Sequence, residues 1–292
     1  MPVSLREILS WIGSPTIFVW DCSAAGNIVT RLEEFAAQRD ADLAAATGQA
    51  VPGAPPVPGV PASAAMMGHA PAGPQAPPPS SHIDPSMLPS VPFRETIQLA
   101  ACQADQSLPM NPDLPADLFT ACLTSPIEMA LRFFILRNPL KSDLDPDLPI
   151  KIPGRLNDRK SALGELSWIF TAVTDTIAWN TLPPALFQRL FRHDLVVAAL
   201  FRGFLLAQRI MRYYDCTPMS VPVLPSTHDH PLWASWDLAV DRCLNQLGPI
   251  LAVVKAREDA AAAGLPLPAE IPFTLSRFFA HQLTAFEVRC VS

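Results

Sequence analysis

Residues 14–39 constrain the fold most, because they read as a strand, a tight turn and a helix in immediate succession. Residues 16–20 are mainly β-branched or aromatic, which is typical of a buried strand. Residues 21–26 are small or turn-forming, and Gly26 is free to adopt a positive φ. Apolar residues then recur at helical spacing, so a helix is expected from about Asn27.

Units of this kind hold a nucleophile at the carboxyl edge of the sheet in several hydrolase folds. The turn offers two candidates, Cys22 and Ser23. A cysteine nucleophile needs a base, normally a histidine on a neighbouring strand. The favoured interpretation is a buried thiol in a structural turn, and catalysis by Cys22 is the alternative. The histidines lie in a proline-rich stretch or in the helical half, at His69, His82, His193, His228, His230 and His281.

Composition argues against several classes of function. The 292 residues suffice for two modest domains, and the formal net charge of −6 argues against general nucleic-acid binding. The 6 cysteines form no CxxC pair, which favours reduced, buried thiols. His228-Asp229-His230 has no third ligand at a typical spacing, and no glycine-rich phosphate loop occurs. Neither a metal nor a cofactor is therefore expected.

Hydropathy argues against membrane insertion and secretion. No uninterrupted apolar run is long enough to span a bilayer. The N-terminus loosely resembles a secretory signal, but Glu7 and Gly13-Ser14-Pro15 interrupt the pattern. A soluble, cytoplasmic protein is expected.

We expect four parts along the chain. Residues 1–42 belong to an α/β domain, and residues 43–93 form a disordered linker rich in proline and alanine, with Asp84 as its only formally charged residue. Residues 94–150 contain a second candidate strand at 96–102 and connecting helices. Residues 151–292 read as helices joined by short turns, which is typical of an α-solenoid.

Capping residues and apolar spacing predict where the helices lie. Ser125 is the expected N-cap of a helix that starts at Pro126, with Glu128 closing a capping box. A short helix at 5–11 precedes the first strand, and the helix after the turn fades at 39–42. The later helices are expected around 163–182, at 185–191, at 195–214 capped by Asp194, from Trp233 to Gly248-Pro249, at 250–263 before Gly264, and around Phe278 to Phe286, with a proline-broken loop at 216–231.

One turn in the helical half is a candidate docking site. It carries Arg155, Asn157, Arg159 and Lys160, within a locally basic stretch of an acidic chain. Solvated helix faces are the simpler explanation of such a stretch. The alternative is a docking surface for an acidic partner.

Several long motifs follow one another along the chain: WIGSPTIFVWDCSAAG, IQLAAC, MNPDLPADLFTACLTSPIEMALRFF, IPGRLNDRKSALGELSWIFTAVTDTIAWNTLP, LFRGFLLAQRIMRYYDCTP, WASWDLAVDRCLNQL and FFAHQLTAFEV. This ordered set closely resembles the raptor family, the regulatory partners of the TOR kinase. The resemblance runs nearly end to end and spares the linker and roughly residues 255–272.

The resemblance implies that residues 14–39 are the last strand, turn and helix of a caspase-like domain. The expected fold is mainly α, an armadillo- or HEAT-like α-solenoid preceded by a partial caspase-like α/β segment. The resemblance also implies a non-enzymatic scaffold of TOR complex 1, in which the turn at Cys22 and Ser23 is vestigial. Such scaffolds bind the TOR kinase, present its substrates, and link the complex to nutrient signals and small GTPases at the lysosomal or vacuolar surface.

The sequence departs from the family pattern in three places. It begins at the turn-bearing strand, so we expect it to lack the upstream Asn-Gly-His-Gly segment that holds a caspase base. It ends within the helical array, and Arg289-Cys290 replaces an aromatic-containing ending. We therefore expect a fragment or partial gene product. Two alternatives to a TOR scaffold stay open: a caspase-like cysteine peptidase that uses Cys22, and a helical-repeat adaptor unrelated to TOR.

Overall fold

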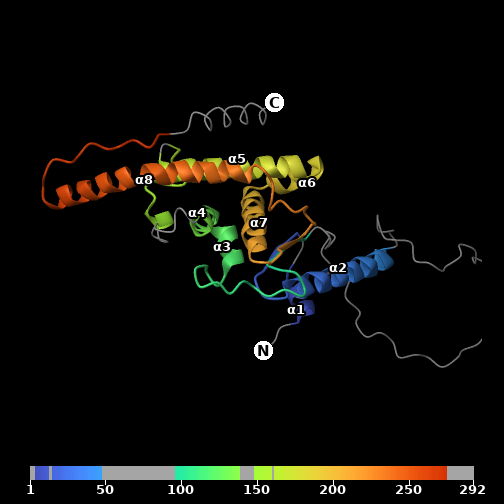
Figure 1. The fold of residues 1–292 in the computed structure, drawn as a ribbon. Coiled ribbons are helices and arrows are strands. Elements are labelled where there is room, and N and C mark those ends of the chain that lie inside the picture. Colours follow the sequence, from blue (N-terminus) through green and yellow to red (C-terminus); the bar gives the residue numbers. More distant parts are fainter. Residues whose placement is uncertain (1–3, 13–14, 48–95, 139–147, 160, 275–292) are drawn as a thin grey trace, which may run out of the picture. The chain divides into compact units, whose positions relative to one another are not determined.

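The computed structural model describes residues 4–12, 15–47, 96–138, 148–159 and 161–274. These residues are mainly helical with one small sheet, which confirms the expected fold class (Figure 1). Most of the expected linker and the expected helix around Phe278 lie outside the described residues. The four-part division of the chain stays a prediction.

The chain separates into two compact units, which are considered in turn. One unit comprises Met1–Phe18 and Asn27–Gln98, and the other comprises Val19–Gly26 and Leu99–Ser292. The boundary passes through the first two strands.

The first unit contains α1 (Leu5–Trp11) and most of α2 (Ala25–Thr47). Helix α1 has the expected bounds and begins with a capping box, in which the Glu7 amide donates to Ser4 Oγ and the Ser4 amide donates to Glu7 Oε2, at 3.2 and 2.8 Å. Helix α2 starts earlier than expected and continues past Asp42. Its last turn is rich in alanine, the strongest helix former.

Three short strands form a sheet in the order β1–β2–β3. They are β1 (Ile17–Trp20), β2 (Ile97–Ala100) and β3 (Met219–Val221). The first two are parallel, since the amides of Ile97 and Ala101 donate to the carbonyls of Thr16 and Trp20, each at 2.9 Å. Strands β1 and β2 were expected. Strand β3 was expected to be loop, because three residues followed by a proline are too short to show an alternating pattern.

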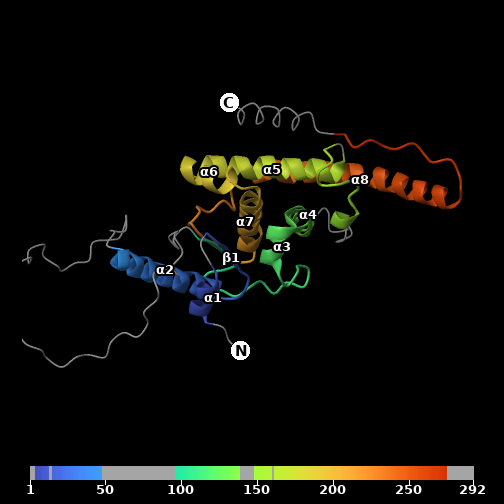
Figure 2. The same ribbon diagram turned by 180° about the vertical axis from the view of Figure 1, so that it is seen from behind.

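The second unit holds the remaining helices. Helix α3 packs on α7, α5 packs on α8, and α6 packs on both α5 and α7. Figures 1 and 2 show α5 and α8 lying side by side, with α7 running across α5. The bounds are α3 (Leu118–Thr124), α4 (Pro126–Arg137), the 3₁₀ helix η4 (Leu148–Lys151), α5 (Ala162–Thr181), α6 (Pro184–Phe191), α7 (Leu195–Tyr213) and α8 (Trp233–Ala262).

Helix α8 is continuous through Pro249, so the predicted break at Gly248-Pro249 is wrong. A proline inside a helix removes one amide donor. Its neighbours Leu247 and Ile250 are 1% and 7% exposed, and this packing offsets the lost hydrogen bond. The helix ends before Gly264, which adopts a φ of +67° and confirms its expected position.

The predicted capping box at Ser125 is also wrong, although α4 does start at Pro126. The Ser125 side chain makes no capping bond. Ser125 also ends α3, and its amide donates to the Ala121 carbonyl at 2.8 Å. Glu128 instead lies 3.7 Å from Arg132. Separately, no helix among the described residues is both long and apolar enough to cross a membrane.

Candidate functional site

The turn between β1 and α2 is shaped by a close backbone approach. Ala24, not Gly26, takes the positive φ, at 57°, so the expectation for Gly26 is wrong. Gly26 is needed for a different reason: a Cβ atom there would lie 2.6 Å from the amide nitrogen of Ala104. The glycine thus lets the start of α2 touch the segment after β2.

Asp21 anchors this turn to α3. Its Oδ2 accepts hydrogen bonds from the Thr120 amide at 3.0 Å and from the Thr120 hydroxyl at 2.6 Å. Its Oδ1 is buried without a hydrogen-bond partner. The carboxylate therefore holds the turn in place by a single oxygen.

Cys22 is not set up as an activated nucleophile. Burial raises the pKa of its thiol, and the neighbouring Cys102 and Asp21 raise it further. A reactive cysteine needs the opposite shift, toward the thiolate. In the described part of the chain, no hydrogen bond or ion pair joins Cys22 to a histidine.

Ser23 and the thiols around the turn have structural partners. Ser23 Oγ accepts a hydrogen bond from the Leu108 amide at 3.1 Å. The Cys102 thiol donates to the Cys22 carbonyl at 3.3 Å, and the Cys216 thiol donates to the Ala101 carbonyl at 3.5 Å. Burial raises the pKa of Cys216 to about 12, so this thiol stays protonated at neutral pH.

Gln106 ties the same region together, a role that sequence reasoning missed. Its Oε1 accepts from the Gln103 and Thr217 amides at 3.2 and 2.9 Å. Its Nε2 donates to the Asp215 carbonyl at 3.1 Å. A lone glutamine after a strand has no distinctive spacing, so this role emerges only from the fold.

The basic turn at 155–160 is held by Ser161. Ser161 Oγ accepts from the Arg155 amide at 3.2 Å and donates to the Asp158 carbonyl at 2.8 Å. The side chains of Arg155, Asn157 and Arg159 are exposed, while Lys160 lies outside the described residues. The structure thus brings three of the four predicted docking residues onto one exposed turn.

Arg159 is ordered by an aromatic neighbour on α5. Its guanidinium carbon lies 3.6 Å from the centroid of the Trp168 ring. Gly164 allows the turn to pack against the start of the helix, because a Cβ there would lie 2.0 Å from the Asp158 carbonyl oxygen. The turn is therefore a fixed feature of the α5 N-terminus.

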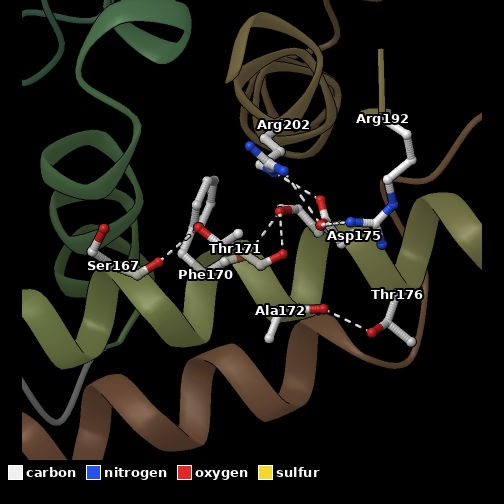
Figure 3. Close-up of polar contacts among 9 residues, drawn as sticks. Ser167, Phe170, Thr171, Ala172, Asp175, Thr176, Arg192 and Arg202 are labelled. Atoms are coloured by element: carbon white, nitrogen blue, oxygen red, sulfur yellow. Dashed lines mark hydrogen bonds and ion pairs between the residues drawn. The ribbon is translucent and has the colours of Figure 1, made fainter. Parts of the chain in front are cut away.

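A buried carboxylate joins three helical elements in the second unit. Asp175, on α5, accepts from Arg202 Nε at 2.7 Å and from Arg202 Nη2 at 3.3 Å, and Arg192 Nη1 lies 3.8 Å away (Figure 3). The Asp175 side chain is only 5% exposed. The two arginines come from α7 and from the end of α6, so this carboxylate fixes the packing of α6 and α7 on α5.

The histidine pair at 228 and 230 shows no metal geometry. His228 Nδ1 lies 2.7 Å from Ser226 Oγ, and His230 Nδ1 accepts from the Leu232 amide at 3.2 Å. No cluster of three or more metal-binding side chains occurs among the described residues.

Comparisons with known proteins agree on one family. Residues 1–32 match the family described as Raptor N-terminal CASPase like domain. The chain is 48% identical over 288 residues to target of rapamycin complex 1 subunit mip1 of Schizosaccharomyces pombe, which is 99% of this chain and 18% of that protein. It is 43% identical to regulatory-associated protein of TOR 1 of Arabidopsis thaliana, over 99% of this chain and 17% of that protein.

The fold is also similar to a solved structure. The crystal structure of Chaetomium thermophilum Raptor matches with a TM-score of 0.70 and 44% identity, over 100% of this chain and 22% of that chain. The chain thus spans about a fifth of the length of these relatives.

Proposed function

Because this chain belongs to the raptor family, we propose that it is a non-enzymatic scaffold segment of TOR complex 1 that binds the TOR kinase and helps present its substrates. Two of the relatives carry names that describe them as a TOR complex 1 subunit and a regulatory-associated protein of TOR. Contacts with small GTPases and recruitment to the lysosomal or vacuolar surface belong to the same proposal, and they rest on the resemblance alone.

The observation that carries the non-enzymatic part is the chemistry of the turn after β1. Cys22 has a raised thiol pKa, and Ser23 Oγ accepts a backbone hydrogen bond. Asp21 serves α3, since its Oδ2 is occupied by Thr120. A caspase-like peptidase needs a thiolate and a general base, so these contacts favour a structural turn over the peptidase alternative.

The basic turn supports the docking part of the proposal. Arg155, Asn157 and Arg159 are exposed on a turn that Ser161 holds in shape, and we include Lys160 from the sequence. Exposed guanidinium groups on a preorganised loop recognise carboxylates at a low cost in conformational entropy. An acidic segment of the kinase or of a substrate is the partner that this turn fits.

Co-purification tests the proposal. The tagged chain is expected to retain the TOR kinase of the same organism on affinity beads, and Cys22→Ala and Ser23→Ala are expected to retain it equally. A purified wild-type chain that cleaves caspase-type peptides, with Cys22→Ala inactive, would establish the peptidase alternative instead. A chain that folds but retains no kinase would favour the adaptor unrelated to TOR.

A further inference from the structure

An apolar patch is exposed where α5 ends and α7 begins. We define this apolar patch as Trp179, Leu195 and Val196, which are 60%, 86% and 67% exposed. Leu195 and Val196 lie in the first turn of α7, where a polar residue would serve the helix equally well. Exposed apolar side chains that are rigidly held near one another are typical of interaction surfaces.

Trp179 is held in place by its neighbours. Its ring packs edge-on against Phe187 of α6, with the centroids 5.1 Å apart. Phe187 stacks in turn on Phe191 at 5.4 Å, and both phenylalanines are buried. An indole that is immobilised before binding loses little conformational entropy when a partner covers it, which is the property of an interface anchor.

The surroundings of the apolar patch carry a surplus of positive charge. The single Asp175 carboxylate, one helical turn before Trp179, faces the guanidinium groups of both Arg202 and Arg192 (Figure 3). Two cations and one anion leave a net charge of one positive unit. The Arg192 guanidinium lies 5.1 Å from the centroid of Phe187, the ring that supports Trp179.

The one acidic residue close to the apolar patch in sequence does not cancel this surplus. Between residues 176 and 201 the only acid is Asp194, against Arg189 and Arg192. Asp194 Oδ1 accepts from the amides of Val196 and Val197 at 2.8 and 2.9 Å, so this carboxylate already caps α7. A partner with carboxylates beside apolar side chains therefore matches both the shape and the charge of this surface.

We propose that the apolar patch docks an amphipathic helix of the TOR kinase whose apolar stripe is flanked by Asp or Glu residues. This inference rests on the proposed function and assigns a surface to it. A helix laid on an apolar strip with a tryptophan and an arginine at its centre is a common mode of peptide recognition. The apolar patch lies at the opposite end of α5 from the basic turn, about 30 Å away along a helix of 20 residues.

Leu195→Asp tests the proposal without threatening the fold. Leu195 is the first residue of α7, where a negative charge is favourable for the helix. The purified kinase and the full chain are mixed, and binding is followed by surface plasmon resonance. Leu195→Asp and Trp179→Ala are each expected to weaken binding by about tenfold or more, and the neutral Leu195→Asn less than Leu195→Asp. The matched control is Val223→Asp, an 81% exposed apolar residue elsewhere, which is expected to bind like wild type.

Other outcomes would overturn the proposal. Equal binding by wild type and Leu195→Asp removes the patch and leaves the proposed function standing, whereas no binding by the folded wild-type chain removes both. Equal losses for Leu195→Asp and Val223→Asp point to a nonspecific effect and exclude this surface. Light scattering that shows a wild-type dimer and a Leu195→Asp monomer assigns the apolar patch to a second copy of the chain. A wild-type association rate that is unchanged between low and high salt excludes the acidic partner.

Discussion

Thr120 donates both its backbone amide and its hydroxyl to Oδ2 of Asp21, at 3.0 and 2.6 Å. Thr120 lies in the first turn of α3, where helix amides lack intrahelical partners. The N-cap residue Asp117 makes no side-chain capping bond. A carboxylate from a distant turn therefore caps α3, and the turn after β1 is held by the same pair of bonds.

Removing these bonds is expected to destabilise the second unit. Thr120→Val deletes the hydroxyl and should lower the free energy of unfolding by about 1–2 kcal/mol. Asp21→Ala deletes the acceptor of both bonds and should cost about 3 kcal/mol, since both are bonds to a charged group. Urea denaturation monitored by tryptophan fluorescence measures both changes.

Thr124→Val is the matched control, because the Thr124 hydroxyl donates only to the carbonyl of Thr120 in its own helix and the residue is exposed. It should change stability by less than about 0.5 kcal/mol. Equal losses for Thr120→Val and Thr124→Val would show that the bond to Asp21 has no special weight.

Local signals predicted the elements whose ends are set by nearby residues. Helix α1 and the Asp194 cap of α7 follow from short-range hydrogen bonds, and both were placed correctly from the sequence. The same kind of signal failed at Ser125, because this residue ends one helix while it precedes the next. It failed again at Pro249, where packing of α8 against α5 outweighs the missing amide donor.

The candidate sites show the same division. The exposed turn with Arg155 and Arg159 was visible from composition, since turns rich in arginine and asparagine stay on the surface. The roles of Gln106 and Asp175 depend on partners far away along the chain, at Thr217 and Arg202. No pattern within one sequence reveals such pairs, so they had to be found in the fold.

Glu165 makes stability depend on pH. It is 6% exposed on α5, and burial raises its pKa from the ordinary 4.5 to about 7. The folded protein therefore holds this proton more tightly than the unfolded chain does. The contribution of the group to stability is greatest below about pH 4.5, declines as the pH rises toward 7, and is constant above that.

Glu165→Gln removes this dependence. At pH 8 the variant should be more stable than wild type by about 1–2 kcal/mol, because an amide has no charge to desolvate. At pH 5 the difference should nearly vanish. Thermal unfolding at a series of pH values measures it, and a difference that stays constant from pH 5 to pH 8 would contradict the assignment.

The Asp175 cluster should respond unequally to loss of its members. Asp175→Ala leaves the Arg202 guanidinium, 17% exposed, without its carboxylate and should cost about 3–5 kcal/mol. Arg192 is 40% exposed and lies 3.8 Å from Asp175, so Arg192→Ala should cost about 1 kcal/mol or less. Chemical denaturation of both variants, with the pair Asp175→Asn and Arg202→Gln as a double-mutant cycle, tests the ranking. A larger loss for Arg192→Ala would show that Arg202 is not the principal partner.

Reversing the charge of the basic turn should weaken kinase binding without unfolding the chain. Arg155 is the cleaner position, because the hydrogen bonds between Arg155 and Ser161 involve its backbone and survive a change of side chain. Arg159→Glu also removes the contact with Trp168, which should cost about 0.5–1 kcal/mol of stability at an exposed site. The measurement is kinase capture by the double variant Arg155→Glu with Arg159→Glu, alongside circular dichroism and a melting curve. The single variant Arg155→Gln tests loss of charge without reversal.

The control for this prediction is Lys255→Glu, which makes the same kind of charge change at an exposed position on α8. It should leave kinase binding unchanged if recognition is local to the turn, because a uniform effect of net charge would weaken both variants alike. The basic turn and the apolar patch lie at opposite ends of α5, so the losses from Arg155→Glu and Leu195→Asp should add in free energy. A double variant that merely unfolds or precipitates shows that the turn is structural, and the docking hypothesis is then dropped.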